Sequence, residues 1–382
     1  MGTDFAPYDG WLSALARANQ YPFSFLDDRW RDVDRWREHA RAKLGEVLSF
    51  EGPQVPLNPR VQRTFEFEGL LIDELTYEVG YGPRVEALFM RPAHVSEPLP
   101  GFVGLHCHGG FKWKGKEKIV KLPGQPPILD RFQEQYYGGR GWATELAKRG
   151  YAVLVHDLFQ WGSRRPDERA ISRDLVGDRF KGVEYGSQTY IDAFNQFMRE
   201  YEHVLAKSLF AAGITWPGIM VLEDRRAVDY LVGRPEVDAS RIGCCGLSGG
   251  GLRTIYLAGI EPRITCAVAV GYVHTLAGLQ EADKHRSHTW MGHLPGLARH
   301  MDLCDVISLH APAPLMVQFD EQDGLFTMPS MQEADAKIAA VYEKAGAPEN
   351  YRGRFYPGPH KFDVQMQEEA FAWFDAHLTR YR

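Results

Sequence analysis

A single serine stands among glycines in the stretch "GCCGLSGGG", residues 243–251. Gly246 and Gly250 flank Ser248 with the spacing G-x-S-x-G, which is typical of a sharp strand-to-helix turn that exposes a nucleophilic serine. The preceding run "RIGCCG" predicts the strand, and the following run "GLRTIYLAGI" predicts the helix. We therefore interpret Ser248 as a nucleophile.

A serine nucleophile needs a general base within hydrogen-bond reach and an acid that orients the base. The loop "GPHKF" follows the predicted strand "YRGRFYP" and carries His360, which we expect to be the base. The predicted strand "APLMVQF" ends in "DEQDGLF", which offers Asp320 and Asp323 as the acid. Asp323 lies one turn beyond the strand and is preferred, whereas Asp320 is interpreted as a surface turn carboxylate.

Acyl transfer also needs N–H groups that stabilise the oxyanion of the tetrahedral intermediate. The amide of Gly249, directly after the nucleophile, is expected to be one donor. The other is expected from "HGGF" after the predicted strand at 102–108, with Gly110 and Phe111 as the candidates. The residues expected to contact substrate are His108, Gly109, His293, Phe194 and Phe197.

Two features near this loop could have other roles. His106 and His108 would share one face of a strand and could bind a metal, but no third ligand cluster accompanies them, so we predict no metal and no cofactor. The basic run "FKWKGKEK", residues 111–118, is predicted to be a solvated surface loop, with a phosphate or substrate clamp as the alternative.

The composition argues against several classes of function. A formal net charge of -6 over 382 residues gives no reason to expect nucleic acid or an anionic membrane as a partner. The five cysteines have no repeating spacing, which favours free thiols in a reducing compartment. No signal-peptide pattern and no long apolar run occurs, so we expect a cytoplasmic protein. A homo-oligomer is compatible with the sequence.

Residues 1–61 predict a helical N-terminal extension, and residues 62–382 predict the main domain. Within it, 62–91 predict antiparallel strands, and the alternating strand and helix patterns that follow predict a mainly parallel sheet with helices on both faces, which is an α/β fold. Residues 158–214 interrupt this alternation with a long amphipathic helix. We predict that this insertion is a lid, with padding of the sheet edge as the alternative.

The chain from about residue 62 to 380 resembles an α/β-hydrolase of the dienelactone hydrolase and acetyl xylan esterase-like group. The resemblance is carried by "HCHGGFKWKGKEK", "HDLFQWGSR", "RIGCCGLSGGG", "HLPGLARHMDLCDVISLHAPAPLMV", "DEQDGLF" and "GPHKF". It places Ser248, Asp323 and His360 at the triad positions. Dienelactone hydrolases proper have a cysteine nucleophile, so the serine favours ester hydrolysis.

These residues together predict a serine carboxylesterase that acts on a small-molecule ester, an acetyl ester among the candidates, through an acyl-enzyme. A serine peptidase or a hydrolase of carbon–carbon bonds is the enzymatic alternative, because the pocket and not the triad selects the substrate. A catalytically silent binding protein on the same fold is the alternative from another class.

Overall fold

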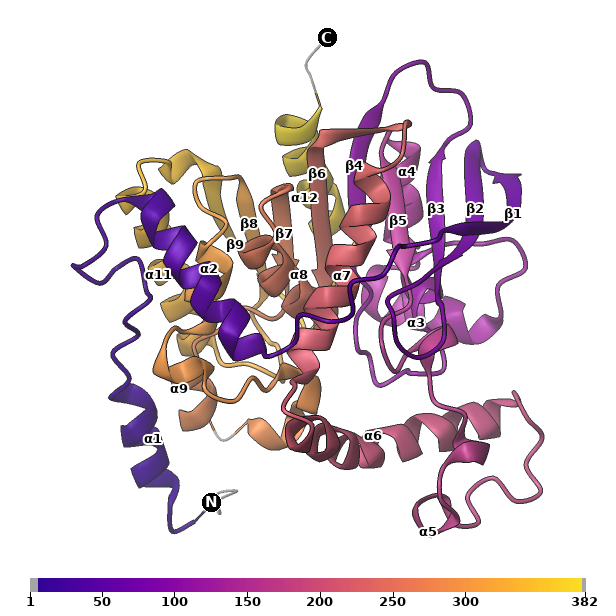
Figure 1. Cartoon of the computed structure of the whole chain (residues 1–382), viewed down its shortest axis with the longest axis horizontal. Helices are drawn as coiled ribbons and strands as arrows, with labels where there is room; N and C mark the ends of the chain where they lie inside the picture. Colours follow the sequence, from indigo (N-terminus) through magenta and orange to yellow (C-terminus); the bar gives the residue numbers. More distant parts are fainter. Residues whose placement is uncertain (1–5, 283, 380–382) are drawn as a thin grey trace.

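The computed structural model describes residues 6–282 and 284–379. A nine-stranded sheet forms its centre (Figure 1). The strands are β1 (Arg60–Phe67), β2 (Leu70–Tyr77), β3 (Val85–Pro92), β4 (Leu99–Gly104), β5 (Ala152–His156), β6 (Val237–Leu247), β7 (Ile264–Val270), β8 (Leu315–Asp320) and β9 (Tyr351–Tyr356). The helices are α1 (Asp9–Arg17), α2 (Val33–Leu48), α3 (Pro127–Tyr137), α4 (Trp142–Lys148), α5 (Arg173–Val176), α6 (Gln188–Ala211), α7 (Trp216–Val232), α8 (Gly249–Ile260), α9 (Leu276–Glu281), α10 (Leu303–Ser308), α11 (Met328–Lys344) and α12 (Val364–Leu378).

The strand order is β1-β2-β3-β5-β4-β6-β7-β8-β9. The strands β1, β2 and β3 pair antiparallel, and β3 also pairs antiparallel with β5. Each neighbouring pair from β5 to β9 is parallel, so these strands end at one edge of the sheet. The predicted α/β fold, with antiparallel strands first and a parallel sheet after them, is confirmed.

Helices cover both faces of the sheet, and the central strand β7 accordingly has apolar side chains on both of its faces. Ala267 and Ala269 belong to the apolar cluster on one face, which α7, α8, α10 and α11 cover. Val268 and Val270 belong to the cluster on the other face, against α4 and α12. Consecutive strand residues point to opposite faces, so a strand that is covered on both sides is apolar at every position.

Two segments lie outside this sandwich. The N-terminal helix α2 packs Trp36, Ala40, Leu44 and Leu48 into the apolar cluster that contains α7 and α8. The insertion after β5 contains α5 and α6, and Figure 1 shows α6 running across the lower edge of the sheet. In the described residues no single helix is long and apolar enough to cross a membrane, although α6 and α7 would pass as a pair bent by 87°.

Candidate active site

The turn between β6 and α8 holds Ser248 in a rare backbone conformation, with φ at 60° and ψ at -121°. The backbone of this turn packs closely against the end of β4. A Cβ atom at Gly246 would lie 2.3 Å from the carbonyl oxygen of Leu105, and one at Gly250 would lie 2.1 Å from it. Both flanking positions therefore require glycine. The strained turn leaves the Ser248 side chain half-buried at the carboxyl edge of the sheet.

His360 and Asp323 meet at the same edge, in the loops after β9 and β8. The distance from His360 Nδ1 to Asp323 Oδ2 is 2.6 Å, and Asp323 Oδ1 accepts a hydrogen bond from the amide of Leu325. The other ring nitrogen, Nε2 of His360, is buried and has no hydrogen-bond partner. Asp323 therefore fixes the ring so that Nδ1 carries a proton and Nε2 is free to accept one.

Asp320 is fully buried rather than part of a surface turn, so that interpretation is wrong. Its Oδ2 accepts a hydrogen bond of 3.0 Å from the amide of Lys361, next to His360, while its Oδ1 has no partner. Burial raises the pKa of Asp320 to about 7. Asp320 anchors the loop that carries His360, and its carboxyl does not contact the imidazole by hydrogen bond.

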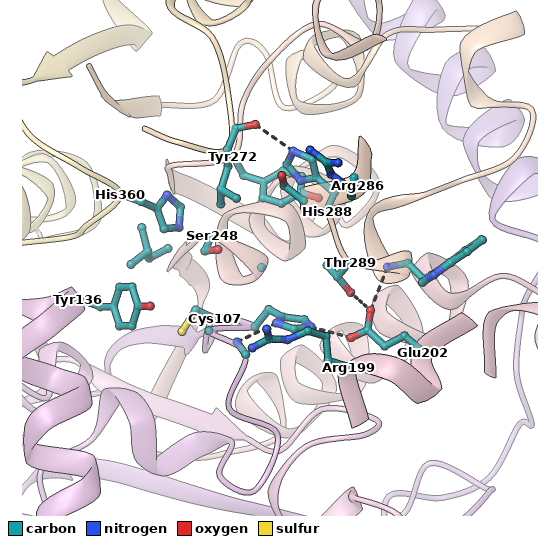
Figure 2. A pocket seen from close by; sticks show the side chains of 18 residues that line it. Cys107, Tyr136, Arg199, Glu202, Ser248, Tyr272, Arg286, His288, Thr289 and His360 are labelled. Atoms are coloured by element: carbon teal, nitrogen blue, oxygen red, sulfur yellow. Dashed lines mark hydrogen bonds and ion pairs between the residues drawn. The ribbon is translucent and has the colours of Figure 1, made fainter. Parts of the chain in front are cut away.

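Ser248 and His360 line one cavity of about 490 Å³ (Figure 2). The cavity is also lined by His108, Gly109, Gly110 and Gly249, for which the sequence predicted substrate-contact or oxyanion roles. Further walls come from α6 and from the segment between α9 and α10. The sequence predicted that both regions contact substrate, but through Phe194, Phe197 and His293 rather than through the residues that line the cavity. That lining consists of Arg199, Glu202, Arg286, Ser287, His288, Thr289 and Trp290, together with Cys107, Tyr136, Leu247, Tyr272 and Leu325.

The loop of residues 105–111, which we call the β4 loop, does not offer the amides that the sequence favoured. The N–H of Gly110 donates to Nδ1 of its neighbour His108, and the N–H of Phe111 donates to the carbonyl oxygen of His108. The backbone nitrogen of His108 instead lies beside Gly249. A Cβ atom at Gly249 would come within 2.7 Å of this nitrogen. Gly110 lines the cavity, but neither expected amide is free.

Glu202, on α6, was missed by sequence reasoning and ties three segments together around the cavity. Its Oε1 lies 2.7 Å from Nε2 of His108 and 2.6 Å from the ammonium of Lys112. Its Oε2 accepts hydrogen bonds from Thr289 Oγ1 and from the amide of Trp290. Burial alone would raise the pKa of Glu202, but the charges and hydrogen bonds of His108 and Lys112 lower it well below its usual value.

Three other predicted pocket residues lie away from the cavity. Phe194 and Phe197 are buried in the apolar cluster on one face of the sheet, and the Phe194 ring lies 5.3 Å from that of Trp113. His293 is half-buried next to the rings of His285 and Trp290, and burial lowers its pKa to about 4. Phe194 and Phe197 do not line the cavity because α6 turns its aromatic face toward the core, and His293 is not among the lining residues either.

The prediction of a solvated loop for residues 111–118 is wrong. Lys112, Lys116 and Lys118 are all buried. Lys112 pairs with Glu202, Lys116 lies 2.8 Å from Oδ2 of Asp157, and Lys118 donates to backbone carbonyls. The run looks solvated in sequence because the carboxylates that pair with Lys112 and Lys116 lie far along the chain.

Within the described residues, the group of ligand-type side chains that could hold a metal ion is Asp320, Asp323 and His360, with atoms within 4.8 Å of one another. These are the carboxylates and the imidazole already described beside Ser248. His106 and His108 do not converge on a common point, since His106 Nε2 accepts from the amide of Leu158 and His108 Nε2 faces Glu202.

This chain has the α/β-hydrolase fold, with this strand order and a sharp turn between β6 and α8. No family model matches the chain. "Putative hydrolase YtaP" of Bacillus subtilis (strain 168) is 24% identical over 319 residues, which cover 83% of this chain and 91% of that protein.

Solved structures with the same fold include a "putative acetyl xylan esterase" from Bacteroides fragilis NCTC 9343, at a TM-score of 0.69 and 17% identity, covering 92% of this chain and 83% of that one. A glucuronoyl esterase from Solibacter usitatus has a TM-score of 0.60 at 16% identity, covering 90% and 92% of the two chains.

Proposed function

We propose that this protein is a serine carboxylesterase. The observation that carries the proposal is the pairing of His360 with Asp323 at 2.6 Å, with the free Nε2 of His360 turned to the cavity wall that Ser248 occupies (Figure 2). The hydrolase and esterase names of the similar proteins support it. A serine, an imidazole base and two amides can catalyse acyl transfer from an ester or an amide, and the esterase names of the similar proteins favour the ester.

In the proposed reaction, Nε2 of His360 takes the proton of Ser248 as its oxygen attacks the ester carbonyl. Asp323 holds the ring and stabilises the imidazolium. The amides of Gly249 and His108 bind the oxyanion; they replace the expected pairing of Gly249 with Gly110 or Phe111. His360 then protonates the departing alcohol, and water hydrolyses the acyl-enzyme by the same proton transfers in reverse order.

The proposed acyl group is small, with acetyl as the simplest case. A cavity of about 490 Å³ is within the usual range for a small-molecule site, roughly 300–1,000 Å³. Acetyl xylan is named for a protein of the same fold. The alcohol side would face Arg199 and Trp290, which line the cavity from α6 and from the segment between α9 and α10.

We expect a fluorophosphonate probe to label Ser248 alone, because only an activated serine oxygen reacts quickly with it. Peptide mapping of the labelled protein, with Ser248→Ala as the control, checks this. In parallel, p-nitrophenyl esters of increasing acyl length are compared with aminoacyl amides, and we expect turnover of the short esters. Labelling elsewhere, or cleavage of amides without esters, would contradict the proposal.

A further inference from the structure

The side chain of Lys118 lies against the β4 loop and is fully buried. Its ammonium donates three hydrogen bonds to backbone carbonyls of that loop, at 2.5 Å to Cys107, 3.2 Å to His108 and 3.3 Å to Phe111. Within residues 6–282 and 284–379, no carboxylate forms an ion pair with it, whereas the neighbouring lysines at 112 and 116 pair with Glu202 and Asp157. The ammonium of Lys118 thus donates its hydrogen bonds to peptide carbonyls, and it also lies over the rings of Phe132 and Trp161, at 5.9 Å and 5.8 Å from their centroids.

Two of these peptide groups have their N–H on residues that line the cavity, His108 and Gly109. The carbonyl of Cys107 and the N–H of His108 belong to the same peptide unit, and the carbonyl of His108 shares a unit with the N–H of Gly109. In the described residues the only cis bonds precede Pro7 and Pro312, so both units are trans, with oxygen and hydrogen on opposite sides. When Lys118 binds the oxygen on one side, the N–H points away from it.

The N–H side of the first unit lies next to the candidate nucleophile. The backbone nitrogen of His108 is adjacent to Gly249, at the start of α8, and both residues line the cavity with Ser248. The first amides of a helix are free to bind an anion. An oxyanion between Gly249 and His108 would therefore be separated from the Lys118 ammonium by one peptide unit.

A cation at a carbonyl oxygen polarises the peptide and makes its N–H a stronger donor, and this effect is large where solvent is excluded. Burial lowers the pKa of Lys118 to about 8, so the amine is still protonated at neutral pH. A buried charge without a carboxylate is costly, and a neutral side chain could fill the same space. The charge itself therefore has a role that packing does not explain.

We propose that Lys118 is a positioning residue for the reaction, which holds the β4 loop and strengthens the amide of His108 as an oxyanion donor. This inference rests on the proposed esterase activity. The charge of Lys118 stabilises the tetrahedral intermediate, in which the carbonyl oxygen is negatively charged, more than it stabilises the bound neutral ester. Loss of the charge should therefore lower kcat and leave KM nearly unchanged.

The test compares Lys118→Met, which removes the charge, Lys118→Gln, which keeps an N–H donor without charge, and Lys118→Arg, which restores charge. Lys116→Met is the matched control, because Lys116 is also buried in the same run but is paired with Asp157, away from the loop carbonyls. The concentration of active enzyme is determined by titrating Ser248 with fluorophosphonate, and each rate is divided by that concentration. A variant that is partly unfolded therefore still gives a correct kcat.

The second measurement is the affinity of an alkylboronic acid. Its boron binds the Ser248 oxygen while the hydroxyl proton passes to His360, which gives a tetrahedral boronate anion. Loss of an oxyanion donor costs about 10²–10³ in kcat. Because Lys118 only strengthens one donor, we expect kcat and boronate affinity to fall together, roughly tenfold, in the Met and Gln variants. KM should stay within about twofold, since the neutral ester gains little from the charge. The Arg variant should recover part of the loss, and Lys116→Met should show none of it.

Equal kcat values in Lys118→Met, Lys118→Gln and Lys116→Met would overturn the inference. So would a fall in kcat with boronate affinity unchanged, because that result would mean a distorted substrate site. Wild-type protein that neither hydrolyses esters nor binds the boronate would contradict the esterase proposal itself, which separates the two failures.

Discussion

Two carboxyl groups lie within reach of the His360 loop, and their contacts assign them different roles. Asp323 contacts Nδ1 of the imidazole, whereas Asp320 holds the backbone amide of Lys361. We expect Asp323→Asn to lower kcat by about 10⁴, because the amide would favour the wrong tautomer of His360. Asp320→Asn keeps an acceptor for the amide of Lys361 and should change kcat only a few-fold. Steady-state kinetics of both variants check this, and a larger loss in Asp320→Asn would mean that the acid is misassigned.

The buried carboxyl of Asp320 also predicts a dependence of stability on pH. Its pKa is raised to about 7 in the folded protein, against about 3.9 in an unfolded chain. Between these values the unfolded state has lost the proton and the folded state retains it, so stability falls as pH rises from about 4 to 7.

Asp320→Asn removes that titration. We therefore expect the variant to gain thermal stability relative to wild type as pH rises from 5 to 7.5, by on the order of a few kcal/mol in free energy of unfolding. Melting curves at the two pH values measure the difference. An identical stability difference at both values would show that Asp320 is ionised throughout this range.

At the scale of the element, α6 presents two distinct faces. Phe194 is fully buried against Trp113, whereas Arg199 lines the cavity and has no ion-pair partner among the described residues. Figure 2 shows Arg199 and Glu202 together on the side of the cavity across from His360. The insertion thus contributes to the cavity wall through its polar residues and to the core through its aromatic ones.

This division predicts opposite outcomes for two substitutions in the same helix. Phe194→Ala should cost about 3–5 kcal/mol of stability and lower activity equally on all esters. Arg199→Ala should leave stability within about 0.5 kcal/mol and lower kcat/KM for esters that carry a carboxylate relative to neutral ones of the same length. Melting temperatures and paired substrates measure both effects. A change of substrate preference in Phe194→Ala would show that the aromatic face reaches the substrate after all.

At the scale of the whole molecule, the residues that are predictable from sequence are those fixed by short motifs and strand order. Ser248, Asp323 and His360 each follow a recognisable strand, and parallel strands bring their ends to one edge. The second amide donor of the proposed reaction, that of His108, and the carboxylate of Glu202 were not predictable. They depend on which atoms of the β4 loop are already hydrogen-bonded and on a contact between α6 and that loop, neither of which leaves a periodic signal.

The basic run at 111–118 illustrates the same limit. Composition alone favours solvent for four lysines in eight residues, because isolated charges are rarely buried. In the structure, Lys112, Lys116 and Lys118 are buried, and their charges are compensated by α6, by the segment after β5 and by backbone carbonyls. Long-range pairing of this kind is decided by the tertiary fold, which a single sequence does not reveal.

The predicted division at residue 61 leaves open whether the N-terminal helices fold with the rest of the chain. The helix α1 has no buried residue, whereas α2 places the fully buried Trp36 against Phe25, with ring centroids 4.8 Å apart. The indole of Trp36 also donates to the carbonyl oxygen of Phe23. The contacts of α2 with the core predict that it belongs to one cooperative unit with the sheet.

Trp36→Ala should therefore lower the free energy of unfolding of the whole protein by about 3–5 kcal/mol. Trp11→Ala is the matched control, because Trp11 lies in α1 with 63% of its surface exposed, and its loss should change stability by less than about 0.5 kcal/mol. Urea denaturation followed by circular dichroism and by esterase activity measures both variants. The two signals should be lost in one shared transition, since removal of α2 would uncover the apolar cluster beneath α7 and α8. If Trp36→Ala loses helical signal in a separate early transition while full activity persists, residues 1–61 are an independent appendage and the core is complete without them.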